Sequence, residues 1–175
     1  MTGCALIRPH AETADEHRTR SWVGVGLVVA ACLAVQAVSA AVTVAALRGD
    51  WYITIPKPEW TPPDRVFGPV WAALFLMMAA AGSLVWLARD REDVCCPLVG
   101  FGLQLAANLA WTVLFFGLHR PFLAFLDVLV LWVLVGLTAL HFFEASRPAG
   151  WLMVPYWLWV SFVAVLNGAI LAQAV

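Results

Sequence analysis

Residues 60–75 read WTPPDRVFGPVWAALF, and they join two kinds of chain that seldom meet so abruptly. The first half contains Pro62 and Pro63, which hold an extended backbone and offer no backbone N–H donor. The second half opens a hydrophobic run in which Pro69 would lie in the first helical turn, where proline is tolerated. This stretch therefore predicts a stiff loop that leads directly into a hydrophobic helix.

The composition around this stretch is that of a membrane protein. Of the 175 residues, 63% are hydrophobic and 12% are charged, whereas soluble domains are about half apolar and a quarter charged. The formal net charge is -1, and no basic patch has the size that neutralising a nucleic-acid backbone requires. We therefore expect membrane lipid as a partner and no nucleic acid.

Five hydrophobic stretches are long enough to cross a bilayer, whose hydrocarbon core of about 30 Å requires roughly 20 residues of helix. Polar segments such as RDRED at residues 89–93 separate them. The short connections after the second, third and fourth stretches predict antiparallel neighbouring helices. The expected fold is an all-α membrane protein, a five-transmembrane-helix bundle. Its expected spans are residues 22–47, 67–88, 97–118, 121–143 and 150–173.

The two ends of the first span differ in character. Residues 1–21 are polar and lack the order of a signal peptide, so we expect a disordered N-terminal tail before a membrane domain at residues 22–175. The positive-inside rule places this tail in the cytoplasm, by six basic residues against four. Residues 48–66 form a long connection rich in proline and aromatic residues, and we expect it to cover the bundle as a structured lid.

Polar and aromatic side chains recur together on the third span. Gln104, Asn108, Trp111 and Phe115 are spaced by four, three and four residues, so one helical face carries all of them. The second and fifth spans show similar rows, which include Trp71, Tyr156, Trp159 and Asn167. An aromatic cavity with a few hydrogen-bonding groups suits a flat, apolar ligand. The alternative is that the tryptophans lie at the membrane interface and the amides join helices.

Asp127 is a carboxylic acid inside the fourth span, where an ionisable group is costly. It could be hydrogen-bonded to a neighbouring helix, reached by Arg120, or engaged in ligand or proton chemistry. The cysteines form no ligand pattern and the motifs of hydrolases and phosphate-binding loops are missing. We expect neither a metal site nor ordinary hydrolytic chemistry.

Four ordered motifs resemble those of the TspO/MBR family, which contains the tryptophan-rich sensory proteins of bacteria and the mitochondrial translocator protein. Residues 51–75, WYITIPKPEWTPPDRVFGPVWAALF, are similar to the first loop and second span of the family. The other three are QLAANLAWTVLFF at 104–116, FLAFLD at 122–127 and PYWLWVSFVAVLN at 155–167. The resemblance covers residues 51–167.

The resemblance implies a five-helix bundle, commonly a homodimer, with a cavity beneath the first loop that binds porphyrins such as protoporphyrin IX. No cofactor is required in this interpretation, and the porphyrin is a ligand. The residues that would touch or cover this ligand are Trp51, Trp60, Asn108, Trp111 and Trp159. Phe75 stands where the family motif has tyrosine, which removes one hydroxyl from the second span. The last residues lack the sterol-recognition pattern of animal members, so a sterol ligand is not expected.

The resemblance implies three functions in order of preference. The first is a membrane protein that binds tetrapyrroles and acts as a sensor or regulator. The second is light- and oxygen-dependent degradation of protoporphyrin IX, in which Trp71 and Trp159 would be the catalytic residues. The third is transport of porphyrin or lipid across the membrane.

Overall fold

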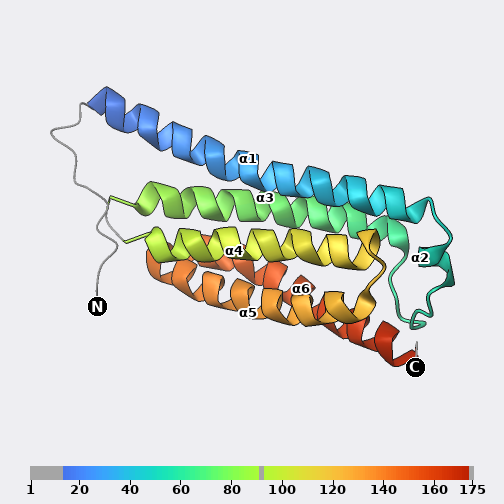
Figure 1. Ribbon diagram of the computed structural model, residues 1–175. Coiled ribbons are helices and arrows are strands. Elements are labelled where there is room, and N and C mark those ends of the chain that lie inside the picture. The colour runs from blue at the N-terminus through green and yellow to red at the C-terminus, as the bar shows by residue number, and fades with distance from the viewer. Residues whose placement is uncertain (1–13, 91–92, 174–175) are drawn as a thin grey trace.

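The computed structural model describes residues 14–90 and 93–173, and within this part of the chain every regular element is helical. Five long helices lie side by side (Figure 1). They are α1 (Ala14–Leu47), α3 (Asp64–Ala88), α4 (Cys95–Thr112), α5 (Pro121–Ala145) and α6 (Arg147–Gln173), with a short α2 (Trp51–Thr54) and a π-helical segment η1 (Val113–Gly117). The prediction of an all-α bundle with five membrane spans is confirmed.

The helix ends differ from the predicted ends at several places. The helix α1 begins at Ala14, so residues 14–21 are helical where a disordered tail was expected. Once the apolar span has nucleated a helix, extending it over residues without proline or glycine costs little. The rest of the predicted tail, residues 1–13, lies outside the described residues.

The second span begins earlier than predicted. The helix α3 starts at Asp64, directly after Pro63, whose extended backbone forms the N-cap position. A carboxylate in the first turn is favourable because it faces the positive end of the helix dipole. The first loop therefore comprises residues 48–63, and α2 lies within it although the sequence pattern showed no helix there.

The five long helices form a ring. Along this ring α1 packs on α3, α3 on α6, α6 on α5, and α5 on α4, while α4 touches α1 and closes the ring. In the most hydrophobic part of α1 only 6% of the residues are buried, against 33–39% in the other four spans. Most of the surface of α1 therefore faces away from the bundle, at its edge (Figure 1).

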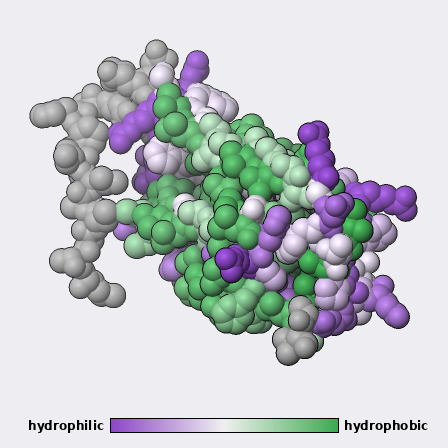
Figure 2. All heavy atoms as spheres, turned by 45° about the vertical axis from the view of Figure 1, so that its right-hand side comes forward, coloured by the Kyte–Doolittle hydropathy of each residue, from purple (hydrophilic) through white to green (hydrophobic). Residues whose placement is uncertain are grey.

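The surface has the polarity that a bilayer requires. Hydrophobic side chains cover the middle of the face drawn in Figure 2, and most hydrophilic ones gather toward its ends. Exposed leucines, such as Leu123, Leu126 and Leu137 on α5, contribute to the apolar surface. The five spans and this surface describe a multi-pass integral membrane protein.

Candidate functional site

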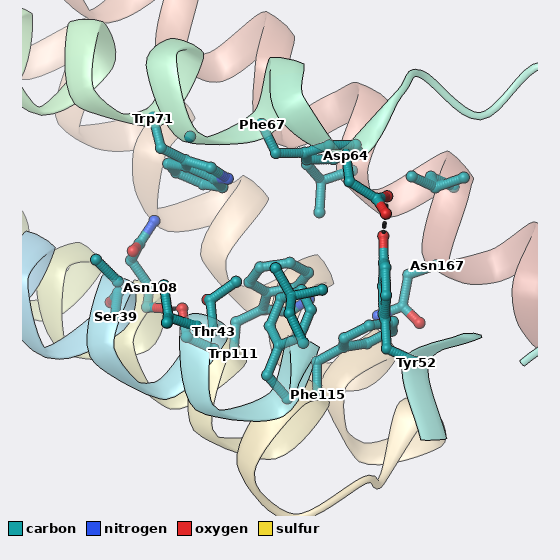
Figure 3. A pocket seen from close by; sticks show the side chains of 18 of the residues that line it. Ser39, Thr43, Tyr52, Asp64, Phe67, Trp71, Asn108, Trp111, Phe115 and Asn167 are labelled. Carbon is teal, nitrogen blue, oxygen red and sulfur yellow. Dashed lines mark hydrogen bonds between the residues drawn. The ribbon is translucent and has the colours of Figure 1, made fainter. Parts of the chain in front are cut away.

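A cavity of about 260 Å³ lies inside the ring at the end where the first loop crosses it (Figure 3). Its walls come from α1, α3, α4, η1 and α6, and the first loop closes one side. Its lining residues include Ser39, Thr43, Tyr52, Lys57, Asp64, Arg65, Phe67, Trp71, Phe75, Asn108, Trp111, Phe115, Phe116 and Asn167.

Aromatic rings form two facing walls of the cavity. Trp71 and Phe67 of α3 lie opposite Trp111 and Phe115 (Figure 3). The rings of Trp111 and Phe115 are stacked, with centroids 5.6 Å apart and planes inclined by 19°. The ring centroids of Trp71 and Trp111 are 6.2 Å apart, and their planes are inclined by 32°. These walls offer broad apolar faces, which favour a flat ring as a guest.

The π-helical segment shapes one of these walls. The neighbours Phe115 and Phe116 of this segment both line the cavity, as the α-helical neighbours Trp111 and Thr112 also do. In η1 the Leu118 N–H donates to the Val113 carbonyl oxygen at 2.8 Å, which is the wide i→i+5 turn of a π-helix. The sequence predicted a regular helix here and missed this turn.

A buried hydrogen-bond network lies at the side of the cavity. The Tyr156 hydroxyl donates to the Gln104 side-chain oxygen at 2.9 Å and accepts from the Asn108 side-chain nitrogen at 3.0 Å. All three residues are buried, but only Asn108 is among the lining residues. The predicted helical stripe on α4 is therefore real, whereas Gln104 and Tyr156 hold α4 against α6 and do not reach the cavity.

Asn167 lines the cavity but its amide is engaged elsewhere. With the amide oriented as its neighbours require, its nitrogen donates to the Pro121 carbonyl oxygen and its oxygen accepts from the Phe125 N–H, both at 3.2 Å. These groups belong to the first turn of α5. Asn167 therefore fastens α6 to the start of α5, in the manner of amides that join helices in lipid.

Trp159 lies behind the wall. Its ring meets that of Trp71 edge-on, with centroids 6.5 Å apart and planes at 90°, and it also contacts Phe67 at 5.7 Å. Its indole N–H is buried and has no hydrogen-bond partner among the described residues. Trp159 is not among the lining residues, and it lies behind two residues that are, Trp71 and Phe67.

The two tryptophans of the first loop lie outside the cavity lining. Trp51 stacks on His119 with centroids 4.3 Å apart and meets Phe115 edge-on at 5.7 Å. Trp60 is 52% exposed and meets Phe162 edge-on. Both tryptophans hold the loop down on the bundle, which agrees with the expectation of a structured lid, but the ring that faces the cavity is Tyr52.

Tyr52 was missed by the sequence analysis and ties the first loop to α3. Its hydroxyl donates to the Asp64 carboxylate at 2.9 Å (Figure 3). The Lys57 ammonium lies 3.6 Å from the centre of the Tyr52 ring. Burial raises the pKa of Tyr52, and the hydrogen bond and charge of Asp64 raise it further. The phenol therefore stays protonated at neutral pH and can donate this bond. We call the Tyr52–Asp64 hydrogen bond the latch. The signal in the sequence was a phenol beside Trp51 with an acid at the start of the next span.

Asp127 is not part of the cavity lining. It lies on α5, and its Oδ2 atom is buried without a hydrogen-bond partner among the described residues. The expected hydrogen bond or Arg120 pairing is thus not formed at this atom. On α1, by contrast, Ser39 does line the cavity, and its buried hydroxyl is likewise unpaired within the described part of the chain.

The amino-acid sequence is similar to those of known proteins. The sequence model of the TspO/MBR family matches residues 28–173. The chain is 42% identical over 122 residues to a tryptophan-rich protein TspO of Chlorobaculum tepidum, covering 69% of this chain and 77% of the relative.

Two further relatives come from other groups of organisms. A tryptophan-rich sensory protein of Cereibacter sphaeroides is 38% identical over 128 residues, covering 73% of this chain and 79% of the relative. The human translocator protein is 36% identical over 119 residues, covering 67% and 70%. With its five spans and its first-loop cavity, the chain belongs to the TspO/MBR family.

Proposed function

We propose that the protein binds a flat apolar macrocycle of the tetrapyrrole class, such as protoporphyrin IX, and acts as a membrane sensor or regulator of that ligand. The observation that carries this proposal is the pair of aromatic walls beneath the first loop, with Trp71 on one side and Trp111 and Phe115 on the other. The ring centroids of Trp71 and Trp111 are 6.2 Å apart, so the two side chains must separate before a flat ring can lie between them. A ring held there would bury both faces against aromatic carbon, which is how flat apolar ligands are commonly held. The name of the Cereibacter sphaeroides relative, a sensory protein, supports the regulatory half of the proposal.

Binding of a whole macrocycle requires the cavity to widen. Its volume of about 260 Å³ is slightly below the ~300 Å³ at which sites for drug-sized ligands begin. Two elements around the cavity can move without breaking many contacts. One is the first loop, which the latch ties to α3, and the other is α1, which buries few residues. We therefore expect ligand entry to be coupled to opening of the latch and displacement of α1 or the loop.

A titration in detergent tests the proposal. Protoporphyrin IX should shift its absorption band saturably on addition of the protein in the dark. Trp111→Leu should weaken binding by about five- to 150-fold, because it removes a stacking face worth roughly 1–3 kcal/mol. Trp151→Leu is the matched control, since Trp151 is 67% exposed and packs on Phe143 away from the cavity. An absorption change that never saturates, or equal weakening by both substitutions, contradicts the proposal.

A second candidate function is photo-oxidative degradation of the bound porphyrin. The observation that favours it is the edge contact between Trp71, which lines the cavity, and Trp159 behind it. Two electron-rich indoles in contact could pass an electron to or from an excited ring at the wall. Transport gains no such support, because Asp127 lies outside the lining residues.

Illumination separates the two candidates. In the presence of dioxygen the enzyme would convert the porphyrin into one defined product, which chromatography resolves. Trp71→Phe and Trp159→Phe should each suppress that product while the dark affinity stays within a few fold. Bleaching that is equal in all variants and gives many products indicates free singlet oxygen, and then only the binding function stands.

A further inference from the structure

The end of the cavity at the first loop differs from its interior by carrying positive charge. We call this end the mouth; Lys57 and Arg65 line it together with Tyr52 and Asp64. Lys57 belongs to the first loop and Arg65 to the first turn of α3, so two separate segments bring their cations to one opening. Elsewhere the lining is aromatic or aliphatic, apart from neutral side chains such as Ser39, Thr43 and Asn108.

The two cations of the mouth are available to a ligand. Lys57 lies over the Tyr52 ring, a cation–π contact that leaves its ammonium without a carboxylate partner among the described residues. Arg65 is exposed and forms no hydrogen bond or ion pair with any described residue. The one carboxylate that lines the mouth, Asp64, already accepts the Tyr52 hydroxyl. Asp64 keeps its negative charge in this hydrogen bond, so the two cations outnumber the one carboxylate and the mouth is positively charged overall.

The depth of these charges matters as well. Lys57 precedes the second span and Arg65 is its second residue, so both lie at the level where the bilayer meets water. An anionic group held there keeps part of its hydration while the attached apolar body lies deeper, between the aromatic walls. Long basic side chains are suited to this because their stems pack on apolar surface and their heads reach water.

We propose that the mouth selects amphipathic ligands that carry carboxylates, with Lys57 and Arg65 pairing with the acid groups while the ring lies between Trp71 and Phe115. This inference rests on the proposed function and adds the chemical class and the orientation of the ligand. The opposite edge of the ring is uncharged, since the inner end of the cavity presents the unpaired Ser39 hydroxyl and the Asn108 amide (Figure 3). A ligand therefore enters with its neutral edge first.

Comparison of protoporphyrin IX with its dimethyl ester tests the inference, because the ester has the same ring and no charge. Binding is measured in nanodiscs of phosphatidylcholine in the dark, against empty nanodiscs that correct for partition of each compound into lipid. The wild-type protein should bind the free acid more tightly than the ester. In the double variant Lys57→Gln, Arg65→Gln, affinity for the acid should fall about two- to thirty-fold, the range for two partly solvated ion pairs, and affinity for the ester should not change.

The controls separate charge from folding and from the field of the whole surface. Unchanged ester binding shows that the double variant is folded with its cavity intact. Arg120→Gln removes an exposed cation that is expected on the same membrane side but does not line the cavity, and it should leave both affinities within about twofold. The acid preference of the wild-type protein should shrink as NaCl rises, since salt screens partly exposed charges.

Two results overturn the inference, and they are distinguishable. If acid and ester bind the wild-type protein equally, or if the double variant weakens both to the same extent, the mouth does not select carboxylates although the cavity still binds the ring. If neither compound binds saturably, the proposed tetrapyrrole function fails and the inference fails with it.

Discussion

The contact between α1 and α3 is closed at one end and open at the other. At the closed end the Arg89 guanidinium donates to the Ser21 hydroxyl at 2.8 Å, and the Trp86 indole N–H donates to the Ser21 carbonyl at 3.2 Å. Midway, a Cβ at Gly82 would lie 2.8 Å from a methyl group of Val28. At the open end the same two helices stand apart around the cavity, and a loop spans the gap.

The difference shows how one helix pair can serve both stability and access. Close packing without side-chain volume, as at Gly82, lets backbones approach and is a main source of association energy between helices in lipid. The open end has polar and small residues of α1, such as Ser39 and Thr43, facing aromatic rings across empty space. Movement of α1 at this end would leave the closed end in place. The predictions below test this division, beginning with the largest expected effect.

Replacing Gly82 by leucine should have the largest effect, because it disrupts the close packing of α1 on α3. The added side chain would meet both Val28 of α1 and the Phe101 ring, 3.2 Å from the new Cβ. Overpacking of this kind costs about 3 kcal/mol, and we expect the midpoint of thermal unfolding in detergent to fall by several degrees. Gly102→Leu is the control, since nothing lies within 4 Å of a Cβ there. Equal losses in both variants would argue against close α1–α3 packing.

Tyr156→Phe should have the next largest effect. It removes the hydroxyl that joins Gln104 to Asn108, and it leaves two buried amides each short of a partner. We expect a loss of about 2 kcal/mol in unfolding free energy, together with weaker ligand binding because Asn108 loses its orientation. Denaturant titration measures the first, and porphyrin titration the second. Tyr156→Phe that is as stable as wild type would show that the network contributes nothing.

Tyr52→Phe should act at the open end alone. Loss of the latch removes one partly buried hydrogen bond to a carboxylate, worth about 1 kcal/mol. Hydrogen exchange should quicken in residues 48–63, and the association rate of the ligand should rise, while the unfolding midpoint barely moves. Thr54→Val is the matched control, because its hydroxyl bonds only to the Trp51 carbonyl within the same turn. Unchanged exchange in the phenylalanine variant would mean that Trp51 and Trp60 hold the loop by themselves.

A pH titration should give the smallest effect. Because burial and then Asp64 raise the pKa of Tyr52, the folded protein keeps this phenol protonated after an unfolded chain would lose the proton. The contribution of the latch is therefore complete at neutral pH and declines as pH rises above about 10. Loop exchange should accelerate in that range for the wild-type protein relative to Tyr52→Phe. Parallel profiles in the two proteins would contradict the assignment.

Helical spacing predicted which residues of the third span share a buried face, but not what each of those residues contacts. The row of Gln104, Asn108, Trp111 and Phe115 lies on one buried face, as the spacing predicts. The spacing does not predict that Gln104 is hydrogen-bonded to the Tyr156 hydroxyl while Phe115 lines the cavity. Periodicity predicts which face of a helix is buried. Whether a residue on that face contacts a neighbouring helix or the cavity depends on how closely the neighbouring helix packs there.

The first loop shows the limit more clearly. Its prolines and aromatic residues correctly predict a folded segment, and its tryptophans were the natural candidates for a cover. Their actual positions depend on distant partners: His119, with a backbone φ of 53°, lies under Trp51, and Phe162 of α6 lies beside Trp60. No local pattern contains those partners, so the positions of Trp51 and Trp60 outside the cavity lining could not be predicted from the loop sequence alone.

By itself the sequence determined the number of spans, the membrane environment and the stiffness of the first loop. The length of each hydrophobic run sets whether it can cross a bilayer, and the proline content of a loop restricts its backbone, so both depend only on local sequence. Only the tertiary structure decided that, of the ten tryptophans, Trp71 and Trp111 line the cavity, that Phe115 and Phe116 lie in a π-helical turn, and that Lys57 and Arg65 meet at the mouth of the cavity. Those outcomes depend on how helices and loop pack against one another, and packing is a property of pairs of surfaces that lie far apart along the chain.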